Sequence, residues 1–552
     1  MPVMNTSYKD LVRMVGHDVP METMLEQIPL LGGVIDEHEE GSDAIAIEFF
    51  PNRPDMYSAE GIARGLKAFL GYEPGLKKYD IGKSDVKAIV TDEVKKIRPC
   101  FVGCVVKGVT IDDQALKSIM ELQEKLHTTL GRKRSKLAIG VHDLDKVKAP
   151  FTFKAVDPDE MSFVPLTKTE AMTPREILQK HEKGKAYAHL LDGFDKYPMI
   201  FDADGNVLSF PPIINGALTT VTVNTKNIFI DVTGFDDKAV ESALNIVASA
   251  LVERGGQIYS IEMEGAPKKV YPDFTPQEKT ISIAACNTVN GIPLTGEECI
   301  KALNRCGMDG KFEGDRLTAY IPAYRFDIMH DADIYEEVSI GYGFEKYGHK
   351  KMRVTQTFGS LLPETSFSEN LKDIMIGLGY TELTTLTLSN QREEFEISGL
   401  PEVDVVTVKN PITEDHTCLR AYMMPSLMRI LRHNKNRDLP QKIFEVGYVI
   451  RDAKNVLHLC ALQAASRTSF TEIKSVTESV LREMNVEYTI SSCDYSTFLP
   501  GRGAFIEVDG KRIGVFGEMS PKCITDFELT HPVMMMEMDI SGIIAKQSGR
   551  LF

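Results

Sequence analysis

Residues 227–256 read NIFIDVTGFDDKAVESALNIVASALVERGG, and this stretch decides the fold class of the module around it. Its beginning, 228–232, is an apolar run rich in β-branched residues, which is typical of a buried strand. After a Thr-Gly turn, apolar residues recur at helical spacing until a glycine pair at 255–256. They are Val240, Ala243, Leu244, Val247 and Leu251. A helix with such a face packs against a sheet, so the sequence predicts an α+β module.

The residues before this stretch have the same mixed character. Their patterns predict a strand at 102–106, a helix from Leu116 to Leu130 and another strand at 137–141. A short basic turn, Arg132-Lys133-Arg134-Ser135-Lys136, joins that helix to the second strand. We therefore expect residues from about 90 to 265 to form one α+β region.

The regions on either side differ in their strand and helix patterns and are bounded by glycine and proline residues. The N-terminal region has strand alternation at 44–50 and a helical pattern that starts at Ala59 and stops at Gly71. A proline-containing connector at 271–276 separates the α+β region from the third region. The chain of 552 residues is long enough for several domains, and we expect four, at 1–88, 89–268, 277–348 and 358–552.

The third and fourth regions have their own helix signals. Residues 279–347 alternate strands with helices at 297–306 and 331–342. A capping-box pattern, Ser366-Phe367-Ser368-Glu369, opens the last region, and strands dominate after it. The sequence therefore predicts a multidomain α+β protein.

Composition excludes several classes of protein. Charged residues make up 26% and hydrophobic residues 43%, as in ordinary globular chains, so disorder and coiled coil are poor interpretations. The net charge of −16 argues against nucleic-acid binding through bulk positive charge. Nine scattered cysteines form no Cys-x-x-Cys pair and are expected to be free thiols. No signal peptide or membrane-spanning run is recognisable, so we expect a cytoplasmic protein.

The densest acidic pattern lies at 325–337, RFDIMHDADIYEE. If a helix starts near His330, then Asp333, Glu336 and Glu337 stand on one helical face, with Asp327 just before the first turn. Oxygen ligands clustered in this way suit a hard cation such as Mg²⁺. The alternative is that acids in a first helical turn offset the helix dipole and face solvent.

A second informative pattern combines the loop SFPPIING at 209–216 with the strand end NIFIDVTG at 227–234. The prolines and the glycine fix an irregular loop, and a strand end can direct polar groups at a ligand, so a pocket is plausible. The alternative is a tight structural turn in which Asp231 or Asp236 caps the following helix.

Two basic clusters and several missing motifs also bear on function. Arg132 to Lys136 form the first cluster, and Arg429, Arg432, His433, Lys435 and Arg437 form the second. Either can contact phosphate, but a solvated face is the commoner explanation of a short charge run. The sequence has no phosphate loop, dinucleotide fingerprint, nucleophile elbow or zinc helix, so an independent nucleotide-using or zinc-using enzyme is weakly supported.

Several longer segments resemble one family, the beta subunits of phenylalanyl-tRNA synthetase. They are PNRPDMYSAEGIARGLKAFLG (51–71), IPAYRFDIMHDADIYEEVSIGYGFEKY (321–347), NPITEDHTCLRAYMMPSLMRILRHNKN (410–436) and IFEVGYV (443–449). QEKLHTTLGRKRSKLAIGVHDLD (123–145) and SFPPIINGALTTVT (209–222) are similar to its archaeal and eukaryotic-cytosolic branch. The resemblance covers nearly the whole chain, in the expected order.

The resemblance implies a fold and a set of partners. It implies a small winged-helix-like domain that carries a metal site, and a C-terminal antiparallel sheet like a class II synthetase core that has lost its catalytic motifs. In keeping with this, IFEVG at 443–447 lacks the arginine that an ATP-binding motif places before the acid. The implied partners are an alpha subunit, in an (αβ)₂ heterotetramer, and tRNA(Phe), with phenylalanine and ATP bound by the alpha subunit.

The resemblance also implies two sites. The acids of the first site, Asp327, Asp333, Glu336 and Glu337, match a Mg²⁺ site shared with the alpha subunit. The second site lies in the region that resembles an editing domain, which hydrolyses tyrosine wrongly attached to tRNA(Phe). The candidate editing residues are Phe210, Pro211, Pro212, Asn215, Gly216, Asp231, Thr233 and Gly234.

The expected function is therefore that of a ligase subunit. With the alpha subunit, the chain attaches phenylalanine to tRNA(Phe) using ATP, and its own editing pocket removes tyrosine. Such a pocket makes physical sense, because a site shaped for phenylalanine poorly rejects an analogue with one added hydroxyl. We recognise no Ser-His-Asp or Cys-His pattern in this module, which favours a positioned water. Two alternatives remain: a stand-alone metal-dependent aminoacyl-tRNA hydrolase and a non-catalytic tRNA-binding or scaffold protein.

Overall fold

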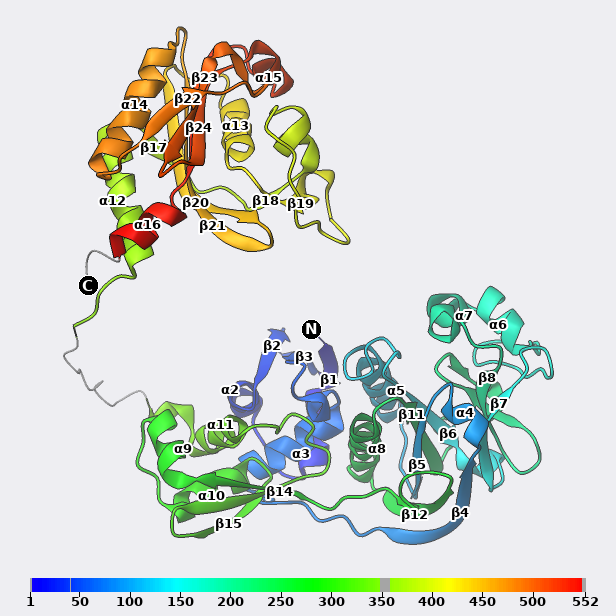
Figure 1. Cartoon of the computed structure of the whole chain (residues 1–552). Coiled ribbons are helices and arrows are strands. Elements are labelled where there is room, and N and C mark those ends of the chain that lie inside the picture. The colour runs from blue at the N-terminus through cyan, green and yellow to red at the C-terminus, as the bar shows by residue number, and fades with distance from the viewer. Residues whose placement is uncertain (1, 40, 348–357, 549–552) are drawn as a thin grey trace. The chain divides into compact units, whose positions relative to one another are not determined.

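The computed structural model describes residues 2–39, 41–347 and 358–548 (Figure 1). The chain divides into two compact units, residues 1–352 and 353–552. The mixed α/β, multidomain fold class is confirmed, because each unit combines helices with its own sheets. All nine cysteines are free thiols, as expected, and eight of them are buried.

The first unit begins with a small sheet of order β1-β3-β2. Its elements are β1 (Val3–Ser7), α1 (Tyr8–Val15), α2 (Met21–Leu30), β2 (Gly33–Glu37), β3 (Ala44–Phe49) and α3 (Ala59–Phe69). β3 and α3 match the strand and the helix that the sequence predicts. Ser58 caps α3 by accepting a hydrogen bond from the Gly61 amide, so the helix starts where the predicted pattern begins.

A ten-stranded sheet forms the centre of this unit. Its order is β10-β9-β8-β7-β4-β12-β5-β11-β6, and β13 pairs with β12. The strands are β4 (Gly82–Val90), β5 (Cys100–Lys107), β6 (Leu137–Asp143), β7 (Phe151–Val156), β8 (Tyr197–Phe201), β9 (Val207–Phe210), β10 (Ile214–Asn215), β11 (Asn227–Gly234), β12 (Gln257–Glu264) and β13 (Val270–Tyr271). The helices between them are α4 (Asp92–Lys95), α5 (Asp113–Thr128), α6 (Pro174–Lys180), α7 (Glu182–Tyr187) and α8 (Asp237–Val252). β4 crosses the expected boundary between residues 88 and 89.

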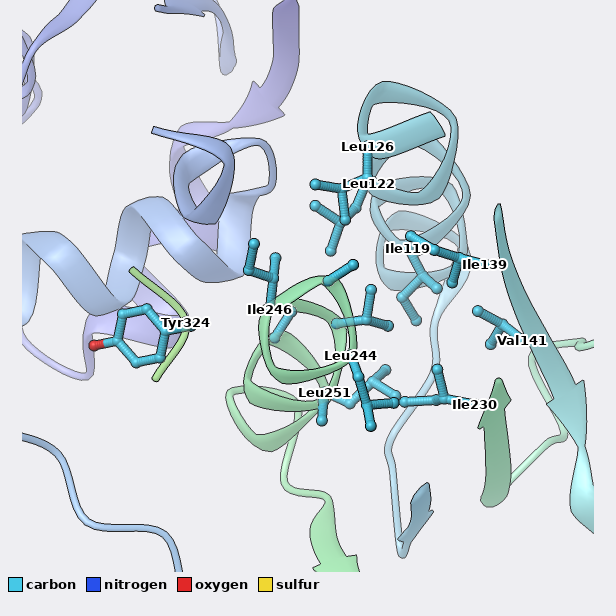
Figure 2. Close-up of a cluster of buried hydrophobic side chains, with 14 of the residues drawn as sticks. Ile119, Leu122, Leu126, Ile139, Val141, Ile230, Leu244, Ile246, Leu251 and Tyr324 are labelled. Atoms are coloured by element: carbon cyan, nitrogen blue, oxygen red, sulfur yellow. The ribbon is translucent and has the colours of Figure 1, made fainter. Parts of the chain in front are cut away.

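Helices α5 and α8 pack on this sheet. In Figure 2, Leu122 and Leu126 of α5 gather with Leu244 and Leu251 of α8 against side chains of β6 and β11 such as Ile230. The sequence predicts one apolar face for α8, but almost every residue from Ala239 to Leu251 is buried. The second face is covered because α3 packs against it, and Arg64 of α3 donates to Ser249 Oγ at 2.9 Å.

A buried ion-pair network joins the C-terminal end of α8 to the N-terminal helices. Arg254 is 6% exposed and donates to both carboxylate oxygens of Asp10 at 2.8 and 2.7 Å. The same guanidinium donates to Glu60 at 2.6 Å. Both acids are themselves buried, and Arg254 is their shared buried cation, although Asp10 also pairs with the more exposed Arg13.

The last part of the first unit is small. Its elements are β14 (Gln277–Ser282), α9 (Ile283–Asn290), α10 (Gly296–Arg305), β15 (Asp309–Glu313), β16 (Arg316–Ile321) and α11 (Asp331–Tyr342), with sheet order β14-β16-β15. α11 has the predicted bounds. α9 was not predicted, because its short segment IAACNTVN continues directly from a strand and only the Ser282 cap marks its start.

The second unit is built on a seven-stranded sheet of order β17-β20-β21-β25-β24-β23-β22, which is antiparallel except for β17 and β20. Its strands are β17 (Thr381–Glu382), β20 (Gln441–Arg451), β21 (Lys454–Ala464), β22 (Thr489–Ser492), β23 (Phe498–Val508), β24 (Lys511–Met519) and β25 (Val533–Asp539). β18 (Leu388–Ser389) and β19 (Cys418–Leu419) form a separate pair. The helices are α12 (Pro363–Gly377), α13 (Met424–His433), α14 (Phe470–Glu483), α15 (Pro521–Asp526) and α16 (Ser541–Ser548).

Both faces of the seven-stranded sheet are buried. Along β21, Cys460 and Leu462 belong to one apolar cluster, with α13, whereas Leu459 and Ala461 belong to another, with α12 and α14. Alternate residues of a strand point to opposite faces, so helices cover the sheet on both sides. The predicted antiparallel C-terminal sheet is present, because all its strand pairs except β17–β20 are antiparallel.

We predict that replacing Arg254 destabilises the first unit strongly. Arg254→Met leaves the buried Glu60 without a cation and leaves Asp10 only its partly exposed partner Arg13, which costs roughly 3–5 kcal/mol. The control, Lys268→Met, removes a cation that pairs with Glu241 and Asp273 near the surface, and is expected to cost less than about 1 kcal/mol. Urea unfolding followed by circular dichroism measures both, because the chain has no tryptophan. Equal losses in the two variants would contradict the prediction.

Candidate functional site

A cavity of about 590 Å³ lies in the first unit beside α5, and we call it the α5 cavity. One face of α5, the middle of β6, the β9–β10 hairpin and the start of α7 enclose it. The α5 residues are Leu116, Met120, Gln123, Glu124 and His127, whose spacing of three and four places them on one helical face. This volume is in the range of small-molecule binding sites.

Six of the eight residues that the resemblance suggests for editing line the α5 cavity. They are Phe210, Pro211, Pro212, Asn215, Gly216 and Asp231. The structure places Thr233 and Gly234 outside it. Thr233 is fully buried, and its hydroxyl and carbonyl accept hydrogen bonds from Arg98 at 2.8 and 2.9 Å. Thr233 and Gly234 therefore belong to the packing at the end of β11.

The hairpin loop is held in place by Arg134. This residue is 8% exposed, and its guanidinium donates to the carbonyl oxygens of Ile213 at 2.8 Å and Pro212 at 3.3 Å. It also donates to Glu124 on α5 at 3.0 Å and lies 4.7 Å from the centre of the Tyr187 ring. One side chain of the basic turn thus connects three walls of the cavity.

The polar centre of the cavity consists of Asp231 and Thr219, which the fully buried His142 connects through hydrogen bonds. Asp231 of β11 contacts His142 of β6, with Oδ2 and Nε2 2.7 Å apart. On the other side of the ring, His142 Nδ1 lies 2.7 Å from Thr219 Oγ1. A neutral imidazole satisfies both contacts if Nε2 donates to Asp231 and Nδ1 accepts from the Thr219 hydroxyl. No partner for Asp231 Oδ1 is found among the described residues, so this oxygen is available to a ligand.

Gly140 makes this arrangement possible. It lies directly opposite Asp231 in the pairing of β6 and β11. A Cβ atom on residue 140 would lie 2.0 Å from Asp231 Oδ2 and 2.5 Å from His142 Nε2. No side chain fits there, so a glycine at this position is required for the Asp231–His142 contact.

Glu124 forms a second polar group at the edge of the cavity. Its carboxylate pairs with Arg134 at 3.0 Å and Lys183 at 3.1 Å. The neighbouring His127 imidazole, and then these two cations, hold the pKa of Glu124 below its usual range. Glu124 is therefore ionised at neutral pH.

His127 is buried in its neutral form. Its Nε2 accepts a hydrogen bond from the Ile139 amide at 2.7 Å, so the proton is on Nδ1. Burial is the main reason why the pKa of His127 is lowered to about 4. Nδ1 faces Glu124 Oε2 at 3.6 Å, a long polar contact through which the imidazole favours the ionised carboxylate.

Ser209 supplies a further polar atom. It is 3% exposed, lines the α5 cavity, and its hydroxyl has no hydrogen-bond partner in the described part of the chain. A buried hydroxyl without a partner is costly, because it has given up hydrogen bonds to water. A ligand with a polar group at this point would satisfy it.

Sequence reasoning missed His142, Thr219 and Glu124 as functional candidates, and it included Ser209 only as part of the loop at 209–216. Glu124 and His142 occur in the conspicuous stretch 123–145, and Ser209 opens the predicted loop, so each had a local signal. The Asp231–His142 contact had none, because 89 residues separate its partners. Only the pairing of β6 with β11 shows that they meet.

The four acids proposed for Mg²⁺ lie at the start of α11 but have different partners. Arg325, 2% exposed, donates to Asp327 at 2.8 and 2.6 Å and to Glu337 at 3.2 and 2.6 Å. Asp333 Oδ2 accepts from the amides of Met329 and His330, each at 2.6 Å, and so caps the helix. Three of the four carboxylates therefore have partners within this chain.

Glu336 is the exception. No partner for its carboxylate is found among the described residues, and burial, followed by the charges of Glu337, Asp333 and Asp327, raises its pKa. Within the described ranges, no three His, Cys, Asp or Glu side chains gather as a metal-binding group. The acids fit a cation in part: their charges converge on Glu336, but this chain alone does not complete a site.

Three residues of the second basic cluster have acidic partners within the chain. Arg429 and Arg432 both contact Glu393, at 3.0 and 3.6 Å, and Lys435 lies 3.7 Å from Glu528. These cations stabilise α13 against its neighbours. His433, Lys435 and Arg437 are exposed, which fits the solvated-face alternative for that part of the cluster.

Buried acids in the second unit also have internal roles. Glu394 accepts hydrogen bonds from the amides of Ala421 and Tyr422, and Glu537 from those of Met423 and Met424. Glu445 pairs with the buried Arg420 at 2.9 Å. These three carboxylates hold the segment that leads into α13. In the part of the chain that the structure describes, no helix has the length and apolar character needed to cross a membrane.

Three family models match the chain. The phenylalanyl tRNA synthetase beta chain CLM domain matches residues 349–540, the tRNA synthetase B5 domain 279–344 and the B3/4 domain 98–262. The last range contains the whole α5 cavity, and the B5 range contains α11.

Curated relatives match over the full length. The phenylalanine–tRNA ligase beta subunit of Archaeoglobus fulgidus is 45% identical, over 98% of each chain. That of Methanocaldococcus jannaschii is 43% identical, over 98% of this chain and all of the relative. Among solved structures, an N-terminal fragment of the phenylalanyl-tRNA synthetase beta subunit from Pyrococcus horikoshii is 40% identical, with a TM-score of 0.60. It covers 62% of this chain and 100% of the fragment.

We predict that His127 makes folding stability depend on pH. Below about pH 6.5 the unfolded chain protonates this histidine, whereas the folded chain, with a pKa of about 4, does not. Stability is therefore lost as the pH falls from about 6.5 towards about 4, by roughly 2 kcal/mol at pH 5.

The variant His127→Gln keeps an acceptor for the Ile139 amide and removes the titration. It is expected to lose roughly 2 kcal/mol less than the wild type between pH 7 and pH 5 in urea unfolding. The exposed His189→Gln serves as the control and should behave as the wild type. Identical losses in all three proteins would show that His127 does not titrate in this range.

Proposed function

Because the chain belongs to the family of phenylalanyl-tRNA synthetase beta subunits, and so is a subunit of a tRNA ligase, we propose that it also proofreads the product of that ligase. The proposed reaction is hydrolysis of the ester that joins tyrosine to tRNA(Phe). The observation that carries it is the polar centre of the α5 cavity, where a buried carboxylate with one available oxygen faces an otherwise largely apolar pocket.

The arrangement suits ester hydrolysis by water. Asp231 Oδ1 accepts a hydrogen bond from a water molecule and orients it towards the ester carbonyl, while His142 holds Oδ2. Thr219 fixes the imidazole in turn, so the carboxylate cannot rotate away. The side chain of Asn215, on β10, lines the cavity from the hairpin wall and can position the carbonyl of the substrate.

Discrimination against phenylalanine follows from the unpartnered hydroxyl of Ser209. The phenolic hydroxyl of tyrosine can exchange a hydrogen bond with it, whereas phenylalanine leaves it buried without a partner. The apolar walls, which include Phe210, Ile213 and Leu116, accept the aromatic ring in either case. The pocket thus selects the substrate that the synthetic site fails to reject.

We predict that Asp231→Asn abolishes editing but not charging. The change keeps shape and removes the acceptor charge, so tyrosyl-tRNA(Phe) hydrolysis by the complex with the alpha subunit should fall by roughly 10²-fold or more. Asn215→Ala should have a smaller effect in the same direction. The measurement is release of labelled tyrosine, with phenylalanine charging followed in parallel.

The matched control is Asp236→Asn, the same chemical change five residues further along the chain. Asp236 caps α8, lies outside the cavity, and Asn is an equally good cap. Hydrolysis at the wild-type rate in Asp231→Asn would move the proposed site elsewhere. A wild-type complex that does not hydrolyse tyrosyl-tRNA(Phe) at all would remove the editing function itself.

Aminoacylation is assigned to the alpha subunit, in an (αβ)₂ heterotetramer that binds tRNA(Phe), phenylalanine and ATP. The support is the internal use of the second unit's acids, since Glu394, Glu445 and Glu537 all bind the segment before α13. These groups are occupied in packing, which fits a class II-like core without a catalytic role. Four domains remain the proposal, although β4 places the first boundary before residue 82, with residues 277–348 as the winged-helix-like domain. The assembly is proposed to work in the cytoplasm.

Mg²⁺ is proposed at the start of α11, with Glu336 as its first ligand and groups of the alpha subunit completing the site. Asp327, Asp333 and Glu337 surround it with negative charge, which a divalent cation would offset. Its role in this proposal is to strengthen subunit assembly.

Glu336→Gln should therefore weaken the heterotetramer, and added Mg²⁺ should partly restore it. Glu337 is less suitable for this test, because its loss also leaves the buried Arg325 short of a partner. The control is Glu313→Gln on the exposed part of β15. Sedimentation of the wild type and both variants with Mg²⁺ or chelator measures assembly. If chelator leaves the wild-type assembly unchanged, Mg²⁺ does not bridge the subunits.

A further inference from the structure

The basic turn between α5 and β6 has an unusual backbone. Arg132, Lys133 and Arg134 have φ angles of 47°, 54° and 68°, so three consecutive residues with side chains adopt the left-handed conformation. Each costs roughly 1–2 kcal/mol relative to the right-handed region. Glycine or asparagine would be the expected choice at such positions. The sequence instead places three cations there.

Surrounding contacts hold the turn in this conformation. The amides of Gly131, Lys133 and Arg134 donate to carbonyl groups in the last turn of α5, at 2.7, 3.2 and 3.0 Å. The buried guanidinium of Arg134 is fixed to the hairpin loop and to Glu124. The turn is therefore a rigid part of the cavity wall.

This conformation separates the three side chains by direction. Arg134 is buried and faces the hairpin, whereas Arg132 and Lys133 are exposed. Among the described residues, no ion pair is found for either exposed cation. The contrast with the second basic cluster is clear, because Arg429 and Arg432 there pair with Glu393. Two cations that lack acidic partners in the described part of the chain, on a rigid backbone turn, differ from an ordinary charge run, whose side chains only face solvent.

The pair adjoins the mouth of the α5 cavity. Arg134, its immediate neighbour, lines the cavity, and Lys183 contributes a further cation on the side of α7. Lys183 reaches Glu124 at 3.1 Å, so it belongs to the same edge. Glu124 and Glu182 line the same edge, so its four cations outnumber its acids in a chain with a net charge of −16.

We propose that Arg132 and Lys133 bind backbone phosphates of the single-stranded nucleotide end that carries the ester into the α5 cavity. This inference depends on the proposed editing function and names a contact surface for its substrate. A cavity of about 590 Å³ encloses a group of ordinary ligand size, so the rest of a polynucleotide must cross its edge. Guanidinium and ammonium groups that a rigid backbone turn presents at that edge match the charge and geometry of phosphodiesters.

The test uses the complex with the alpha subunit and two substrates. One is tyrosyl-tRNA(Phe), and the other is 3′-O-tyrosyl-adenosine, which has the ester but no backbone phosphate. Arg132→Ala/Lys133→Ala should raise KM for the tRNA by roughly tenfold with kcat retained, and leave hydrolysis of the small ester unchanged. The slope of log KM against log salt concentration should fall by about 1.4, because two phosphate contacts on a single strand are lost.

The matched control is Lys83→Ala/Lys269→Ala. It removes the same charge from exposed positions on β4 and before β13, neither of which lines the cavity. In a second variant, Lys133→Gly, the ammonium group is lost, and glycine adopts the left-handed conformation without strain, so the fold stays intact. It should raise KM for the tRNA without lowering Tm.

The outcomes separate the phosphate contact from the editing function. If the wild type hydrolyses neither substrate, the editing function fails. If the wild type hydrolyses both, and the double variant matches the control in KM and salt slope, the phosphate contact is overturned while editing stands. Loss of hydrolysis of the small ester in both Arg132→Ala/Lys133→Ala and Lys133→Gly would also overturn it, because the turn would then act only through the shape of the cavity.

Discussion

Helix α8 is buried on both of its faces, and the arrangement of the first unit depends on this. One face packs on β5, β6 and β11 together with α5, and the other meets α3. Because the helix has no exposed face, the N-terminal helices cannot separate from the large sheet without exposing apolar surface. Arg254 pairs with Asp10 of α1 and Glu60 of α3, and these ion pairs fix the positions of both helices relative to the end of α8. The helix of the central module therefore also organises its neighbours.

The α5 cavity depends on the same packing. α8 and the sheet fix β6 beside β11, and their register places Gly140 opposite Asp231 with His142 on the diagonal. α5 then closes one side, and its cavity-facing residues bring Glu124 and His127 to the edge. Arg134 joins this edge to the hairpin. The polar groups lie on regular elements, which hold their geometry better than mobile loops would.

Arginine decides the roles of several acids in this protein. Arg325 forms ion pairs with Asp327 and Glu337, and Arg254 with Asp10 and Glu60. Arg420 pairs with Glu445. A buried carboxylate is stable only with such a partner, or with several amide donors, as for Glu394 and Glu537. Asp231 and Glu336 differ from them, because each retains acceptor capacity within the described chain. This difference is why we assign them ligands.

The sequence by itself determined the local elements and the family. Periodicity predicted α8 and α11, and the long motifs indicated the family that full-length relatives confirm. The prolines predicted an irregular loop at 209–216, but only 211–213 form a turn, and it joins strands β9 and β10. These features are local, since spacing and caps within some twenty residues specify them. The short helix α9 was not predicted, because its apolar pattern spans only eight residues and follows directly from a strand.

Only the tertiary structure decided which residues meet. His142 and Asp231 are 89 residues apart, and Arg64 meets Ser249 across 185. No periodicity within a segment encodes such contacts, because they depend on strand order and helix packing. Thr233 looked equivalent to Asp231 in the sequence, but Arg98 covers it at the end of β11. Likewise, the acids before and in α11 suggested a single metal-binding cluster. In the structure the buried Arg325 binds Asp327 and Glu337, two carboxylates that a metal ion would otherwise share.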